Sequence, residues 1–161
     1  MTDSAEIGWP ELAKQIRTHL DEISAEMVKE IQTRLPEYAR PLDPTYTRTV
    51  QVGVEHAVQH FIDVLERREG GGENWRELFR AIGAGEMREG RSLDTLQAAL
   101  RLCARVGWRW MVALAQADGA SLTTLGLLAE AIFTYLDQIA DASATGYAQA
   151  QAAAAGELDR R

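Results

Sequence analysis

One helix with apolar side chains around most of its circumference constrains this chain more than any other feature. The segment starts at Leu93 and closes at Asp118-Gly119. One predicted face carries Leu93, Leu96, Leu100, Cys103, Gly107, Met111 and Leu114, and a second carries Ala99, Leu102, Val106, Trp110 and Ala113. A helix with two apolar faces is typical of the central, buried helix of an all-α domain.

The residues before this helix predict where it begins. Gly85 and Gly90 bracket a break in the preceding helix. Ser92 stands at the expected N-cap, where its hydroxyl can accept a backbone N–H of the first turn. Asp94 lies in that first turn, where the positive end of the helix dipole favours a carboxylate.

Apolar spacing and helix breakers predict about five helices and no strands. The expected helices cover about residues 10–35, 43–68, 74–88 and 92–118, with a last one from about 121 to the end. Pro10 is acceptable in an opening turn, Pro36 ends the first helix, and the glycines at 70–72 end the second. The number and size of the helices fit a globin-like bundle with a long C-terminal helix.

The last predicted helix has a regular apolar seam. Its 3–4 spacing resembles a coiled-coil seam, and we expect it to form a dimer and signalling surface through Leu125, Ile132, Leu136 and Ile139. Residues 148–161 are rich in Ala and Gln and then charged, without a stop signal after Arg161. We therefore expect a sensory domain over residues 1–147. Residues 148–161 are expected to begin a linker helix that continues toward further modules.

Composition narrows the class of protein. The chain has 161 residues, enough for one domain with a sizeable core, and a net charge of −7, which argues against a nucleic-acid-binding surface. Cys103 is the single cysteine, so no intrachain disulfide can form. The start lacks the features of a signal peptide, and no run is long enough to span a bilayer. A cytoplasmic protein without membrane contact is expected.

A basic stripe on the central helix is the first candidate binding feature. Arg101, Arg105 and Arg109 recur every four residues, and the last predicted helix carries an acidic face of Glu130, Asp137 and Asp141. The two stripes can pair with each other or face water. The sharper alternative is an anionic ligand, for which Arg101, Arg105 and Trp108 are the candidate ligand-binding residues.

The histidines offer little metal or haem chemistry. His56 and His60 are four residues apart on one helix, which leaves a tetrahedral metal site half built. Haem needs an axial ligand such as His on a helix that lines an apolar pocket, and the central helix has no His. Neither a nucleophile with its base nor a glycine-rich phosphate loop stands out. We expect no enzyme activity, no metal and no cofactor.

The segment from Gly90 to Arg101, followed by Trp108-Arg109, resembles a family signature. It is similar to the RsbRD-type (RsbT co-antagonist-like) N-terminal domain of PucR/CdaR-type transcriptional regulators of high-GC bacteria. The opening helix, the break at Pro36 and Pro41, and the spacing of Glu86 to Gly90-Arg91-Ser92-Leu93 agree, so the resemblance covers nearly the whole chain. It implies a globin-related sensory fold without haem, usually dimeric, whose last helix passes a signal to downstream modules.

The expected function is therefore a non-enzymatic sensory and dimerisation domain of a bacterial transcriptional regulator. The DNA-binding modules would lie outside this segment, and the signal would be a small molecule or a protein. Two alternatives remain open. One is a globin-type sensor that binds haem or a fatty-acid-like ligand, and the other is a scaffold subunit of a stressosome-like complex.

Overall fold

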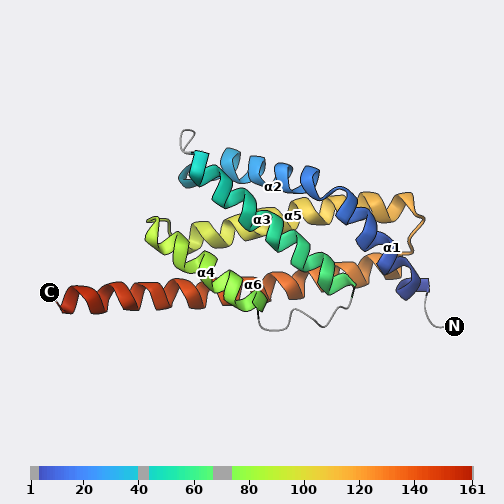
Figure 1. Ribbon diagram of the computed structural model, residues 1–161. Coiled ribbons are helices and arrows are strands. Elements are labelled where there is room, and N and C mark those ends of the chain that lie inside the picture. The colour runs from blue at the N-terminus through green and yellow to red at the C-terminus, as the bar shows by residue number, and fades with distance from the viewer. Residues whose placement is uncertain (1–3, 40–43, 67–73, 161) are drawn as a thin grey trace.

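The computed structural model describes residues 4–39, 44–66 and 74–160. These contain the α-helices α1 (Ser4–Thr18), α2 (Leu20–Arg34), α3 (Pro44–Leu65), α4 (Asn74–Arg88), α5 (Leu93–Ala117) and α6 (Leu122–Asp159), with a short 3₁₀ helix η1 (Pro36–Tyr38) (Figure 1). The described residues contain no strand, so the predicted all-α class is confirmed. None of the helices in these ranges is both long and apolar enough to cross a membrane.

The first predicted helix is in fact two helices, so the expectation of one helix over residues 10–35 is wrong. α1 begins at Ser4, before Pro10, and the chain bends at His19. The backbone N–H of His19 is shared between the carbonyl oxygens of Gln15 (3.2 Å) and Ile16 (3.1 Å). The bend contains neither proline nor glycine, the residues that usually reveal a kink in a sequence. Both α1 and α2 contact α3 and α5.

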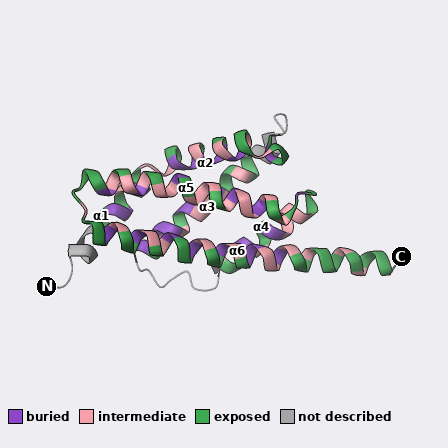
Figure 2. Cartoon of the chain, turned by 180° about the vertical axis from the view of Figure 1, so that it is seen from behind, coloured by how far each residue is buried: buried purple, intermediate pink, exposed green. Residues whose placement is uncertain are grey.

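α5 is the central helix, as its two apolar faces predict. It packs against α1, α2, α4 and α6, and Val106 at its middle is completely buried (Figures 1 and 2). The predicted cap is present, because the Ser92 hydroxyl accepts the backbone N–H of Thr95 at 3.1 Å. Gly90 before it has φ +80°, a backbone conformation that favours glycine.

α4 and α6 run in the same direction and touch backbone to backbone. A Cβ on Gly83 would overlap the carbonyl oxygen of Ser143, and a Cβ on Gly146 would overlap the carbonyl oxygen of Arg80. Only a residue without a side chain allows helices to approach this closely. The two glycines therefore set the crossing point of α4 on α6.

α6 continues well past this crossing as one uninterrupted helix. Tyr147 still bonds to the bundle, through a hydroxyl that donates to the carbonyl oxygen of Arg91 at 2.7 Å. Most residues from Ala148 to Arg160 are exposed, and this part of α6 projects beyond the other helices (Figures 1 and 2). The domain boundary expected between residues 147 and 148 falls inside α6 and stays a prediction.

The glycine contact makes a direct prediction. Gly83→Ala should lower the free energy of unfolding by about 2–3 kcal/mol or more, since the backbone of α6 cannot move aside cheaply. Gly156→Ala is the matched control, because a Cβ there meets nothing within 4 Å. It should raise stability by about 0.5–1 kcal/mol through better helix propensity. Urea denaturation measures both, and equal effects of the two substitutions would contradict the close crossing.

Candidate functional site

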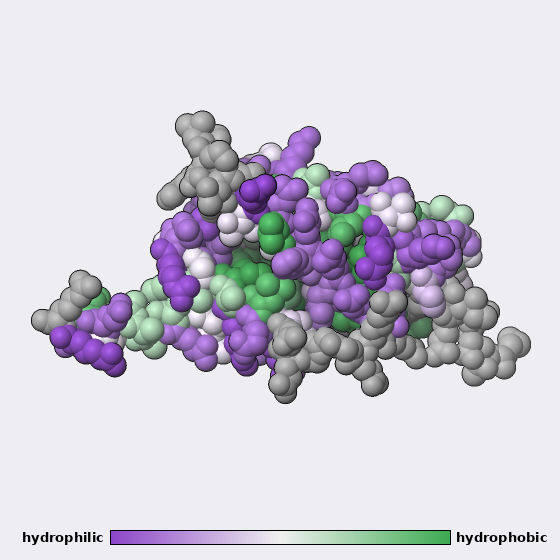
Figure 3. All heavy atoms as spheres, in the orientation of Figure 1, coloured by the Kyte–Doolittle hydropathy of each residue, from purple (hydrophilic) through white to green (hydrophobic). Residues whose placement is uncertain are grey.

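A cavity of about 590 Å³ lies in the core, and residues of all six α-helices line it. Its wall is predominantly apolar and includes Ile23, Met27, Val54, Phe61, Leu78, Phe79, Leu100, Trp110, Met111, Ile132 and Ile139. α3 and α4 do not pack closely against each other, and the cavity reaches the surface between them. Figure 3 shows hydrophobic atoms in a recess of this face.

The size and lining of this cavity are those of a small-molecule site. Protein interiors are close-packed, with few voids larger than a water molecule. Pockets of roughly 300–1,000 Å³ with apolar walls and a few polar groups are typical of ligand sites. The cavity is therefore the candidate functional site of this chain.

One end of the cavity is polar and is formed by a buried ion pair. Arg91 is only 5% exposed, and its guanidinium donates two hydrogen bonds to the carboxylate of Glu86. In one of them, Arg91 Nη2 lies 3.0 Å from Glu86 Oε1. The Tyr38 hydroxyl donates to the same carboxylate at 2.7 Å. The Arg91 guanidinium also lies over the Tyr38 ring, 4.8 Å from its centroid. We call Tyr38, Glu86 and Arg91 the polar triad.

The turn between α4 and α5 ties the polar triad to two further residues, Glu37 of η1 and Tyr147 of α6. Glu37 of η1 accepts the backbone N–H of Ser92 at 3.3 Å. The carbonyl oxygen of Arg91 accepts the hydroxyl of Tyr147 from α6. The residues that close one end of the cavity are thus hydrogen-bonded to the helix that leaves the bundle.

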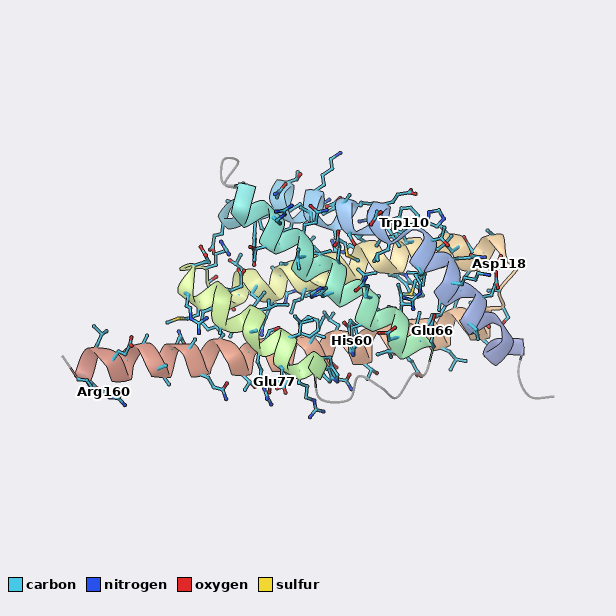
Figure 4. All side chains as sticks on the ribbon, viewed as in Figure 1. His60, Glu66, Glu77, Trp110, Asp118 and Arg160 are labelled. Atoms are coloured by element: carbon cyan, nitrogen blue, oxygen red, sulfur yellow. The ribbon has the colours of Figure 1, made fainter. Side chains whose placement is uncertain are left out.

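Beside the cavity, aromatic side chains pack around Tyr135, which is itself a lining residue. His60 stacks on Trp75 with 5.3 Å between ring centroids, and its Nδ1 lies 3.1 Å from the Tyr135 hydroxyl (Figure 4). That hydroxyl donates its proton to the carbonyl oxygen of Ala57 at 2.8 Å, so His60 Nδ1 must be the donor to Tyr135. Desolvation by burial lowers the pKa of His60, only partly opposed by the charge of Asp63.

The two histidines weighed as a metal pair therefore have separate surroundings. His60 packs against Trp75 and Tyr135 and does not line the cavity, whereas His56 is exposed and lines it. In the described ranges, no group of three or more His, Cys, Asp or Glu side chains is placed to hold a metal ion. Cys103 also lines the cavity, and desolvation raises the pKa of its thiol to about 12, so the thiol stays neutral.

The ligand-binding residues predicted from the basic stripe lie outside this cavity. Arg101 and Arg105 are exposed on the outer side of α5, and Trp108 is half-buried. None of these three residues lines the cavity wall, whereas Trp110 does, with its indole N–H donating to Glu26 at 2.6 Å. Their role in binding an anion stays a prediction.

The residues predicted for the dimer surface face the inside of their own chain. Ile132, Leu136 and Ile139 line the cavity, and Leu125 is half-buried against the core. Their role between two copies of the chain stays untested. These side chains pack inside their own bundle, so the opposite face of α6 is the one that is accessible to a second copy.

Comparison with known proteins agrees with the resemblance in the sequence. The family model of the PucR-like N-terminal domain matches residues 7–161, nearly the whole chain. A search of curated proteins and a search of solved structures each found no match. The globin-like arrangement therefore stays a prediction.

The polar triad predicts a strong coupling between its charges. Arg91→Met should lower the free energy of unfolding by about 3–5 kcal/mol, because Glu86 would be left buried without its cation. The double variant Arg91→Met with Glu86→Leu should be more stable than the single variant, since no unpaired charge remains. Urea denaturation of the four proteins of this cycle measures the coupling. Simple additivity of the two single effects would contradict the buried pair.

His60 predicts a loss of stability in mild acid. Its pKa in the folded chain lies below the ordinary value of 6.5, so the unfolded chain binds the proton more readily. This contribution is complete above about pH 6.5, falls as the pH drops through the folded pKa, and is constant below it. His60→Gln should remove this part of the pH dependence in urea denaturation. An unchanged pH profile would contradict the desolvated imidazole.

Proposed function

Because this chain belongs to the PucR-like N-terminal domain family, we propose that it is the non-enzymatic sensory and dimerisation domain of a bacterial transcriptional regulator. In this proposal it acts in the cytoplasm as a homodimer. α6 passes the signal to DNA-binding modules elsewhere in the regulator. The net charge of −7 supports a domain that does not itself contact nucleic acid.

The observation that supports signal transfer is that α6 both lines the cavity and projects from the bundle. Its first half supplies Ile132, Tyr135, Leu136 and Ile139 to the cavity wall, and its second half projects from the bundle. Between the two halves, Tyr147 bonds to Arg91 of the polar triad. A change in the cavity would therefore act on the same rigid helix that leaves the domain.

The outward face of α6 supports association with a second copy. Leu122, Phe133 and Leu158 are 85%, 65% and 72% exposed. Leu122 and Phe133 are about three helical turns apart, and Phe133 and Leu158 about seven. The three side chains therefore lie in one line along the helix. Exposed apolar side chains in a line are typical of an interaction surface. A two-fold axis beside α6 would bury this stripe against itself and place the two projecting ends together.

The charged stripes favour the same partner. Arg101, Arg105 and Arg109 are exposed on α5, and Glu130 and Asp137 belong to the exposed acidic face of α6. Within the described part of the chain, neither stripe forms an ion pair with other side chains. A second copy presents the opposite charge to each stripe, which would guide the orientation of the pair.

Light scattering and a reporter gene test this proposal with one substitution. The wild-type chain should have the mass of a dimer, and Phe133→Glu should be a monomer with unchanged circular dichroism, because a charge would be buried at the interface. In the full-length regulator, Phe133→Glu should also abolish the regulated response.

Thr134→Glu is the matched control for this experiment. It adds the same charge at the next residue of α6, also exposed, and should leave the dimer intact. A monomeric wild-type chain, or a dimeric Phe133→Glu variant, would reject the dimer surface. A much larger assembly would instead favour the scaffold subunit of a stressosome-like complex.

A further inference from the structure

We propose that the cavity binds an uncharged, predominantly apolar small molecule, which enters between α3 and α4. As the input signal of a sensor this assignment rests on the proposed function. Binding itself is carried by the lining of the cavity and needs neither the dimer nor the relay.

The walls of the cavity favour an apolar body. All six α-helices contribute aliphatic, aromatic or methionine side chains to a cavity of about 590 Å³. Removal of apolar ligand surface from water there favours binding through the hydrophobic effect. Met27 and Met111 are unbranched and flexible, so this part of the wall can adapt to the shape of its occupant.

The charges of the lining disfavour an ionic ligand. The charged residues that line the cavity are Glu86, Glu89 and Arg91, and Glu89 is exposed. The other two already neutralise each other in the polar triad. A carboxylate ligand would have to displace Glu86 from Arg91 and leave that side chain buried without its partner, which is costly. A cationic group would likewise have to displace Arg91 from Glu86, so a neutral polar group such as a hydroxyl fits this end of the cavity best.

The mouth of the cavity can be closed without disturbing the backbone. A Cβ on Gly85 of α4 meets no atom within 4 Å, and a Cβ on Gly53 of α3 would be 4.0 Å from the Cδ1 atom of Ile82. Both residues line the cavity where it opens. A leucine at either position can therefore extend into the opening in a helical conformation that it readily adopts.

The charge of the ligand is tested with two competitors of the same chain length. Nile red, a neutral dye, should bind the wild-type chain with increased fluorescence. Dodecan-1-ol should displace the dye at a concentration at least about tenfold lower than dodecanoate at about pH 8, where the acid is ionised. Equal or better competition by dodecanoate would overturn the uncharged class. No binding of either the dye or the alcohol would overturn the cavity as a site.

The location of the site is tested with Gly85→Leu. This variant should weaken dye binding at least about tenfold with unchanged circular dichroism. Gly156→Leu is the matched control on the projecting part of α6, where a Cβ also meets nothing within 4 Å, and it should bind as the wild type does. Gly53→Leu closes the mouth from α3 and replaces Gly85→Leu if that variant does not fold. Wild-type binding by a folded mouth variant would overturn the proposal.

The outcome of this experiment is independent of the proposed function. A monomeric chain that binds the dye in the cavity would reject the dimer and retain the ligand site. A dimeric chain that binds neither the dye nor the alcohol would do the reverse.

Discussion

The contact between two helix backbones at Gly83 and Gly146 determines how the rest of the bundle is arranged. Because α4 lies directly on α6 there, it does not also cover α3. The space left between α3 and α4 is the mouth of the cavity. The same contact brings the end of α4 beside the middle of α6, where Tyr147 reaches the carbonyl oxygen of Arg91. The cavity mouth and the hydrogen bond from Tyr147 to Arg91 thus both depend on the contact between α4 and α6.

The polar triad places hydrogen-bonding groups at the end of the cavity where the chain turns from α4 to α5. The turn between α4 and α5 closes one end of an apolar cavity, and backbone groups in such a place need partners. Arg91 and Glu86 supply charges that satisfy each other, and Tyr38 and Tyr147 complete the set. A buried ion pair is costly to desolvate, so the attraction between Arg91 and Glu86 adds little net stability to this end of the bundle.

Much of the fold could be predicted from local signals in the sequence. The cap at Ser92, the stop at Pro36 and the central position of α5 all follow from short-range chemistry. The break at His19 could not, since no proline or glycine marks it. The family was predicted correctly from the segment that contains Arg91.

The candidate site was not predictable in the same way. Helical spacing shows which faces are apolar, but the cavity depends on which of those faces meet across the bundle. Ile132 and Ile139 have the spacing of a seam, yet the seam faces the cavity of their own chain. Arg91 was part of the family signature, whereas its burial against Glu86 required the turn of the chain at Gly90.

Because α6 is long beyond its crossing with α4, a small tilt of this helix would move its end by a larger distance. From Gly146 to Asp159 the helix rises by about 20 Å. A tilt of about 10° around the glycine contact would therefore move its end by about 3 Å, while side chains beside the contact would move by only a fraction of that. Small helix shifts of this kind are common in regulatory transitions. The contact at Gly83 and Gly146 would thereby be the pivot of α6, and a small tilt within the bundle would become a larger displacement at the projecting end of the helix.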